Sequence, residues 1–191
     1  MSNWKQRSKV YHLFRKSIFT KNIFEEECYS LTELLKLVPQ KSLKKVLDIG
    51  TGIGDSLHLF DDFTNRFLLD FSFEMLSKLR LINSDIKLVG NVSTLPLKKN
   101  SFDLITCIGV SEYISEKDVL LHQIYKTLKK EGYALVTFSP PKILNKMRNL
   151  SGKRIYPISG STAHDLIAAQ RFFIVQVFKT KLQSQYLLQK L

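Results

Sequence analysis

The sequence has no apolar run that approaches the roughly 20 residues needed to cross a bilayer, which excludes a transmembrane helix. It has only two cysteines, Cys28 and Cys107, too few and too far apart for a disulfide framework. We therefore expect free thiols in a reducing compartment, the cytoplasm. Histidines are also few, and none has a cysteine or an acid at ligand spacing, so no metal site is predicted. The four are His12, His58, His122 and His164.

Acidic residues are scarce at both flanks. Residues 1–45 hold 10 Lys and Arg against four acids, and residues 141–191 hold nine against one, within a net charge of +12. Such a field can concentrate phosphate-bearing or other anionic partners. A lysine-rich solvated surface explains the same numbers, because a charge excess alone selects neither a fold nor a ligand.

What the sequence does have is an alternation of short apolar runs with helical periodicity. Phe24, Cys28, Leu31 and Leu34 recur at three- and four-residue steps, and Pro39 stops that predicted N-terminal helix. Five strand-like runs follow, separated by helical segments. The first helix is expected to run from the glycine turn to about Phe60, and the second is expected to be capped by Ser72. The last is expected over 119–129, with a capping box from Ser115 and Asp118 and with Gly132 just past its end. The strands are expected at 45–49, 66–70, 86–90, 102–108 and 133–138.

The tail departs from this alternation. Pro140-Pro141 breaks the chain, a basic helical stretch extends to Leu150, and a short helix capped by Thr162 or Asp165 is expected before two strands, 172–178 and 185–191. The prediction is one α/β domain over 1–191 with a doubly wound, seven-stranded, mostly parallel sheet and a C-terminal antiparallel hairpin. Its parts are a helical N-terminal cap (1–44), a cofactor-binding core (45–140) and a substrate-side segment with the closing hairpin (141–191).

The first strand runs directly into a turn containing Gly50, Gly52 and Gly54. Glycines there let the backbone approach a ligand closely, since a Cβ would collide with it. Asp48 precedes the turn, and Asp70 ends the next strand, where a carboxylate can accept both ribose hydroxyls. A glycine turn can also serve packing alone, and Asp70 can be a helix cap, so the combination carries the prediction of a nucleotide-like cofactor.

The stretch Val46-Leu47-Asp48-Ile49-Gly50-Thr51-Gly52-Ile53-Gly54 resembles the first motif of class I S-adenosylmethionine-dependent methyltransferases, particularly those acting on quinones, lipids and natural products. The similarity extends over about residues 44–140. Later motifs are matched by Leu69-Asp70-Phe71-Ser72 with Met75-Leu76, by Gly90-Asn91-Val92 through Leu95-Pro96, by Ser101-Phe102-Asp103-Leu104-Ile105 and by Leu128-Lys129-Lys130-Glu131-Gly132-Tyr133.

The resemblance implies S-adenosyl-L-methionine as the cofactor and assigns its contacts. Asp48 would hold the glycine turn or the amino group, Asp70 the ribose, Phe71 the adenine face, and Asn91 the adenine amino group. Asn91 departs from the family's usual Asp, although its amide oxygen can still accept a hydrogen bond. The remaining implied cofactor-binding residues are Gly50, Thr51, Gly52, Gly54, Val92, Cys107 and Ile108.

Methyl transfer from a sulfonium is an in-line displacement in which positioning supplies much of the acceleration. If a residue removes the proton of the acceptor, the candidates are Glu112 and Tyr113 after the fourth strand and His164 after the fifth. Tyr113 as a pocket wall and His164 as a surface residue are the structural alternatives, because geometry decides before pKa.

The leading hypothesis is a methyltransferase for a small-molecule acceptor, with an anionic acceptor compatible with the basic flanks. RNA methylation is the alternative favoured by the cations of residues 142–154, although no Asn-Pro-Pro-Tyr-type motif follows the fourth strand. A noncatalytic partner protein with the same fold is a third hypothesis. Peripheral membrane contact through the basic helix of residues 141–150 is a fourth. The sequence does not specify an oligomeric state.

Overall fold

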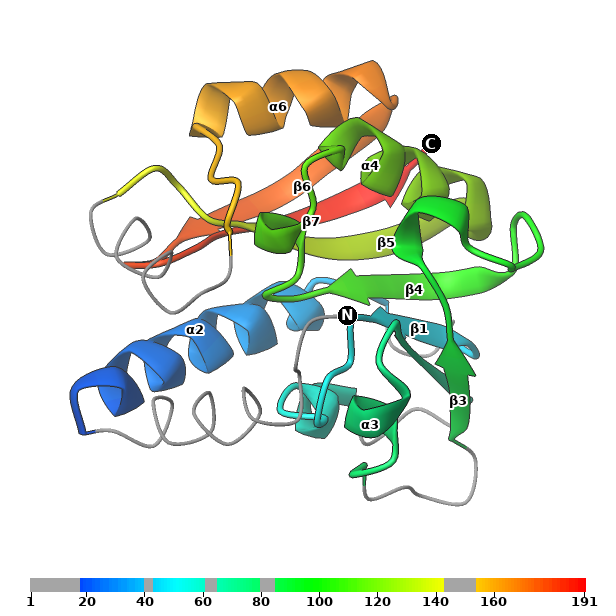
Figure 1. Ribbon diagram of the computed structural model, residues 1–191. Coiled ribbons are helices and arrows are strands. Elements are labelled where there is room, and N and C mark those ends of the chain that lie inside the picture. The colour runs from blue at the N-terminus through cyan, green and yellow to red at the C-terminus, as the bar shows by residue number, and fades with distance from the viewer. Residues whose placement is uncertain (1–17, 40–42, 61–64, 80–84, 143–153) are drawn as a thin grey trace.

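The computed structural model describes residues 18–39, 43–60, 65–79, 85–142 and 154–191, which form one seven-stranded sheet with helices on both faces (Figure 1). The strand order is β3-β2-β1-β4-β5-β7-β6. The strands are β1 (Val46–Ile49), β2 (Arg66–Asp70), β3 (Ile86–Val89), β4 (Phe102–Cys107), β5 (Leu128–Phe138), β6 (Phe172–Lys179) and β7 (Ser184–Lys190).

The first five strands pair in parallel, and β7 pairs antiparallel with both β5 and β6. The predicted mostly parallel sheet with a closing antiparallel hairpin is therefore confirmed. β1 and β4 are central and mostly buried, as expected of parallel strands covered on both faces. All the parallel strands bring their carboxyl ends to the same edge of the sheet.

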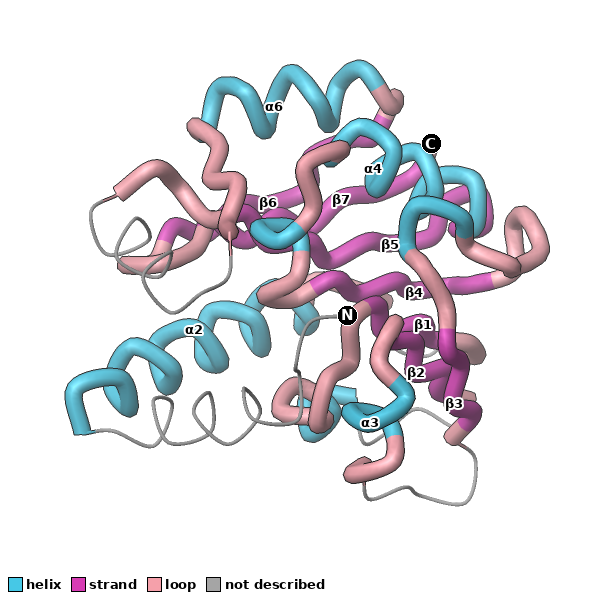
Figure 2. The backbone as a smooth tube through the Cα atoms, viewed as in Figure 1, coloured by secondary structure: helices cyan, strands magenta, loops and turns pink. Residues whose placement is uncertain are grey.

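Two large hydrophobic clusters lie on opposite faces of the sheet, and a smaller third cluster consists of Leu57, Leu68, Leu76 and Leu79. The helices that cover the two faces can be followed in Figure 2. Helices α4 (Lys117–Thr127) and α6 (Gly160–Ala169) cover one face, and α2 (Ile18–Lys36) covers the other. Neighbouring strand residues alternate between the two cores: Leu104 joins the α2 side and Ile105 the α4 side. This period of two is the geometry of an extended strand.

The segment after the glycine turn differs from the sequence prediction. A helix was expected to run to about Phe60, but turns lead only to the 3-10 helix η2 (Leu57–Phe60). The next helix, α3 (Phe73–Leu76), is also short, and its predicted cap is confirmed because the Ser72 hydroxyl accepts from the Met75 amide.

The predicted ends of α4 and α6 were wrong. Glu116 is the N-cap of α4 and makes no side-chain cap bond, so the expected capping box does not form; the helix ends at Thr127. β5 follows at once, and Gly132 lies buried inside it rather than past a helix end. The hydroxyl of Ser159, not Thr162 or Asp165, caps α6.

The basic stretch predicted as a helix over 141–150 lies mostly outside the described residues. So do the Lys146, Arg148 and Lys153 cations on which the RNA alternative depended. Among the helices that the structure describes, none is at once long and apolar enough to span a bilayer.

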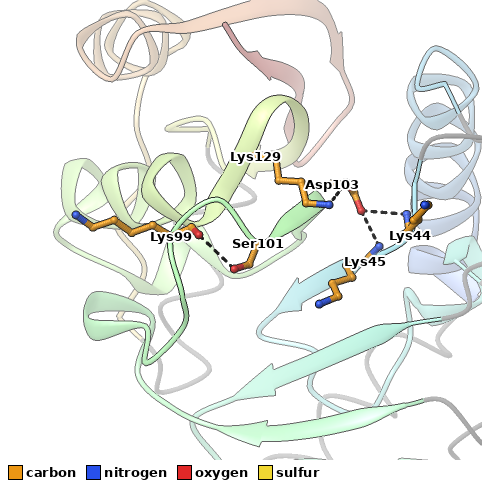
Figure 3. Close-up of polar contacts among 6 residues, drawn as sticks. All are labelled: Lys44, Lys45, Lys99, Ser101, Asp103 and Lys129. Carbon is orange, nitrogen blue, oxygen red and sulfur yellow. Dashed lines mark hydrogen bonds and ion pairs between the residues drawn. The ribbon is translucent and has the colours of Figure 1, made fainter.

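Asp103 ties together three segments at the amino end of β4. Its Oδ2 accepts from the Lys44 and Lys45 amides at 3.0 and 2.8 Å, and its Oδ1 lies 2.6 Å from Lys129 Nζ (Figure 3). Burial raises the pKa of this carboxyl, but the Lys129 and backbone donors outweigh it and leave the pKa below its ordinary value. Ser101 donates to the Lys99 carbonyl beside this cluster.

Candidate functional site

A cavity of about 170 Å³ lies at the carboxyl edge of the sheet. Its walls come from α2, from the glycine turn after β1, from the loop after β4 and from the loop that leads into β7. The described lining residues are Ile23, Phe24, Glu27, Cys28, Leu31, Gly50, Thr51, Gly52, Ile53, Asp55, Ser56, Leu59, Met75, Ile108, Gly109, Glu112, Leu182 and Gln183.

The glycine turn is held to the end of β2 by its own amides. Gly50 and Thr51 both donate to the Leu69 carbonyl, at 2.7 and 3.1 Å, and Gly52 donates to Asp70 Oδ2 at 2.9 Å. Three successive N–H groups are thus used inside the protein. The turn contributes shape to the site more than free donors.

The three glycines of the turn have different surroundings. Gly50 has a φ of +72°, and a Cβ there would come within 2.3 Å of Val110 Cγ2, so the residue permits close packing of the turn against the loop after β4. Gly52, at a φ of +59°, faces the cavity, where an added Cβ would meet nothing nearer than Met75 Cε at 3.6 Å. Gly54 does not line the cavity, and an added Cβ there would collide with Leu79 Cδ2 at 2.7 Å.

Asp70 is buried at the tip of β2 and accepts two backbone bonds. One is the Gly52 bond, and the other joins the Ser72 amide to Oδ1 at 2.9 Å. Each carboxylate oxygen keeps a further lone-pair position for a ligand hydroxyl. Asp70 is therefore more than a helix cap, because its side chain also holds the glycine turn in place.

Asp48 is buried beneath the turn. Its Oδ1 accepts from the Thr106 hydroxyl at 2.7 Å, while Oδ2 has no hydrogen-bond partner among the residues that the structure describes. Burial raises the pKa of Asp48 to about 6, although the Thr106 bond opposes the shift. A buried carboxylate with a free oxygen suits a cationic ligand group, as the resemblance implied for the amino group of the cofactor.

The residues predicted for the adenosine end meet at the tips of β2 and β3. Asp70 pairs with Val89 across the two strands, and Gly90 donates to the Asp70 carbonyl at 3.0 Å. Phe71 is 58% exposed, which leaves ring surface for an adenine to cover. The Asn91 side chain accepts from the Ser93 amide at 2.9 Å and caps the 3-10 helix η3 (Val92–Thr94).

The end of β4 contributes backbone more than side chains. Cys107 is fully buried in the core, where burial, Asp48 and Glu112 together raise the pKa of its thiol. The next residue, Ile108, lines the cavity. Gly109, with a φ of +69°, donates its amide to the Thr137 hydroxyl at 2.8 Å and leaves open space on the cavity side.

Of the three acid–base candidates, only Glu112 lines the cavity. It lies in the 3-10 helix η4 (Ser111–Tyr113) and is 1% exposed. Tyr113 is not among the lining residues. His164 lies on α6, where its Nδ1 is 2.7 Å from the Gly160 carbonyl and its ring packs edge-on against Tyr186, away from the cavity wall.

Sequence reasoning missed two walls of the cavity. Ile23 and Glu27 lie one helical turn apart on α2, and Leu182 with Gln183 precede β7. The helical face of α2 was predicted as core, which it is from Leu31 onward. A glutamate within that apolar face, at Glu27, was the available signal.

These residues suit S-adenosyl-L-methionine. Gly52 and Gly109 leave space in the cavity that a Cβ would occupy. The Asp48 oxygen that has no partner among the described residues complements an ammonium, and Asp70 lies at a strand tip next to the exposed Phe71. The donor set and the free space therefore fit this cofactor.

Comparison with known proteins points the same way. Residues 47–136 match the methyltransferase domain family. A protein of unassigned function from Methanocaldococcus jannaschii is 37% identical over 114 residues, which covers 60% of this chain and 47% of that protein. The ubiquinone/menaquinone biosynthesis C-methyltransferase UbiE of Shewanella frigidimarina is 31% identical over 131 residues, with 61% and 52% covered. The chain thus spans about half the length of these curated relatives.

Solved structures share the fold. The magnesium protoporphyrin IX methyltransferase ChlM of Synechocystis PCC 6803, with bound SAH, superposes with a TM-score of 0.73 at 15% identity, covering 92% of this chain and 88% of that one. An S-adenosylmethionine-dependent methyltransferase from Mesorhizobium loti gives 0.72 at 13% identity, covering 83% and 96%. The chain has the Rossmann-like fold of these enzymes.

Residues 47–136 thus match the methyltransferase domain family, within a chain that has the fold of these S-adenosylmethionine-dependent enzymes.

Proposed function

We propose that this protein transfers the methyl group of S-adenosyl-L-methionine to a small-molecule acceptor. The observation that carries the proposal is the cavity of about 170 Å³, which lies beside the glycine turn and is lined on one side by α2. Most of its lining side chains are apolar, as is usual for sites that enclose a small ligand. The similarity to a C-methyltransferase of quinone biosynthesis is compatible with this acceptor class.

The residues of the chain would bind, orient and exclude water. When bound, the cofactor supplies an electrophilic methyl group on a sulfonium. The open faces of Gly52 and Gly109 would admit its methionine part, and Asp48 would balance its ammonium. Asp70 would hold the ribose while keeping the turn in place. Holding the acceptor in line with the methyl group is then the main contribution to rate.

The cofactor assignment is tested by calorimetric titration with S-adenosylhomocysteine. Asp70→Asn should lower the affinity at least tenfold, because it replaces one oxygen with an amide that cannot accept from a backbone N–H, and about 1.4 kcal/mol corresponds to tenfold. Asp103→Asn is the matched control. It removes a carboxylate with two backbone donors at the opposite edge of the sheet, so it should affect stability but not affinity.

The acceptor class is tested with S-adenosylmethionine labelled in its methyl group. The protein is incubated either with a low-mass extract of the source organism or with its total RNA. Label in the low-mass fraction supports the proposal. Label confined to RNA, with binding that weakens steeply with salt, would instead establish the nucleic-acid alternative.

A further inference from the structure

Gln183 places a buried amide in the wall of the cavity, on the loop that leads into β7. The residue is 7% exposed, and its Oε1 has no hydrogen-bond partner within the described parts of the chain. Most buried polar atoms in folded proteins are hydrogen-bonded, because an unsatisfied one loses its bonds to water without replacement. An unsatisfied oxygen in a cavity wall therefore suits a donor group on a ligand.

The loop that carries this side chain is fixed through its backbone. The Gln183 amide donates to the Thr180 hydroxyl at 3.1 Å, and the Thr180 amide donates to the Gln183 carbonyl at 2.8 Å. Lys142 Nζ donates to the Thr180 and Lys181 carbonyls at 3.3 and 3.4 Å, which ties the loop to the segment after β5. A side chain that starts from a fixed loop loses less freedom when it binds a ligand.

The end of the Gln183 side chain lies over Gly109. Its Nε2 is the atom nearest to the Cβ position of that glycine, at 4.0 Å. Gly109 and the glycine-turn residues Gly50 and Gly52 line the same cavity as Gln183. The loop before β7 thus faces the space in which the methionine part of the cofactor is proposed to lie.

The two ends of the cofactor offer different groups to the protein. Adenine and ribose are assigned to Phe71 and Asp70 at the tip of β2, and neither residue is among those that line the cavity. The amino-acid end carries an ammonium, which has three N–H donors and can bond to more than one acceptor. An amide oxygen accepts from an ammonium without adding a second buried charge, so Gln183 can complement this end together with Asp48.

We propose that Gln183 binds the amino-acid end of S-adenosylmethionine, with its Oε1 accepting a hydrogen bond from the cofactor ammonium. This inference rests on the proposed function and adds a positioning residue to its site. Gln183 lies outside residues 47–136, so the match to the methyltransferase domain family does not include it. By fixing the methionine arm, it would help to aim the sulfonium methyl group at the acceptor.

Two nucleosides separate this contact from the rest of the site. S-adenosylhomocysteine carries the amino-acid end, whereas 5′-methylthioadenosine lacks it and keeps the adenine, the ribose and the sulfur. In calorimetric titrations of the full chain, Gln183→Met should weaken S-adenosylhomocysteine about tenfold and leave 5′-methylthioadenosine within about twofold, because only the first offers an ammonium to the lost oxygen. Equal weakening of both nucleosides, or no change in either, would overturn the proposal.

A third probe identifies the group that Gln183 binds. S-adenosyl-3-thiopropylamine keeps the ammonium of S-adenosylhomocysteine and lacks its carboxylate. Gln183→Met should weaken it about tenfold as well. A loss confined to S-adenosylhomocysteine would mean that the carboxylate is the partner, and would overturn the assignment to the ammonium.

Two variants provide matched controls. Gln123→Met makes the same change on α4, at a glutamine whose Oε1 also lacks a hydrogen-bond partner among the described residues and which does not line the cavity, so both affinities should stay unchanged. Asp70→Asn should weaken both nucleosides alike, because both carry the ribose that Asp70 would hold. If Gln183→Met follows the pattern of Asp70→Asn, its effect is general to the site and the proposal fails.

The unmodified protein separates this proposal from the proposed function. If S-adenosylhomocysteine does not bind it, the proposed function fails. If S-adenosylhomocysteine binds and Gln183→Met shows no selective loss, only the role of Gln183 is overturned. Gln183→Met keeps the length of the side chain and removes an oxygen without a partner among the described residues, so the variant should fold.

Discussion

Replacing Gly50 by alanine should be among the most destabilising single-methyl additions in this protein. The new Cβ would come within 2.3 Å of Val110 Cγ2 and 2.9 Å of Val110 Cγ1. An overpacked contact of this kind costs about 1–3 kcal/mol. A left-handed backbone with a φ of +72° adds about 1–2 kcal/mol for a residue with a Cβ. The expected loss in the free energy of unfolding is therefore roughly 2–5 kcal/mol.

The chain offers a control that isolates the collision from the backbone strain. Gly109 has nearly the same φ, +69°, but the nearest atom to its added Cβ is 4.0 Å away. Gly109→Ala should therefore lose only the conformational part, about 1–2 kcal/mol. Urea denaturation of both variants, at equal m-values, measures the difference.

Val110→Ala provides the rescue. With both Cγ atoms removed, the nearest Val110 atom to the new Cβ is its own Cβ at 3.1 Å. Gly50→Ala should then cost at least about 1 kcal/mol less in the Val110→Ala background than in the unmodified protein. A coupling energy below about 0.5 kcal/mol, or a Gly50→Ala variant no less stable than Gly109→Ala, would refute the argument that close approach to Val110 requires this glycine.

Two further predictions concern buried charges. Because the pKa of Asp48 is raised from 3.8 to about 6, the folded state holds a proton between these values that the unfolded chain releases, so stability should fall as pH rises through this window. Asp48→Asn should remove this pH dependence, raise the free energy of unfolding by up to about 3 kcal/mol at neutral pH and weaken cofactor binding. Urea titrations across this pH range measure the effect, and an unchanged dependence of stability on pH would contradict the raised pKa of Asp48. Asp85→Ala should lower the free energy of unfolding by about 3–5 kcal/mol, because it removes the carboxylate that accepts from buried Arg66 at 2.7 and 2.8 Å. In thermal melts, the double variant Arg66→Met/Asp85→Leu should lose less stability than Asp85→Ala, since it removes both buried charges. The reverse order would contradict this prediction.

Much of the core fold could be predicted because the governing patterns are local. The apolar run at 102–108 reads as a strand covered on both faces, and β4 occupies such a position in the sheet. The glycine turn follows β1 as the spacing requires, with left-handed φ values at Gly50, Gly52 and Gly54. Parallel strand ends then brought Asp48 and Asp70 to one edge without further information.

The helix ends could not be predicted in the same way. The predicted capping box at Ser115 had a local rival at Glu116, and the chain uses Glu116 with no side-chain bond at all. α4 is held by its buried face, Leu120, Leu121 and Ile124, so burial rather than capping decides where it begins.

The walls of the cavity depend on contacts between distant parts of the chain. Gln185 on β7 donates to the Glu27 carbonyl of α2 at 3.2 Å, across 158 residues of sequence. No local pattern encodes that contact, so the pairing of α2 with the loop before β7 was not foreseeable. The lining residues on α2 and in the loop before β7 were missed for this reason, whereas Ile108 and Glu112, which follow a predicted strand, were among the predicted residues.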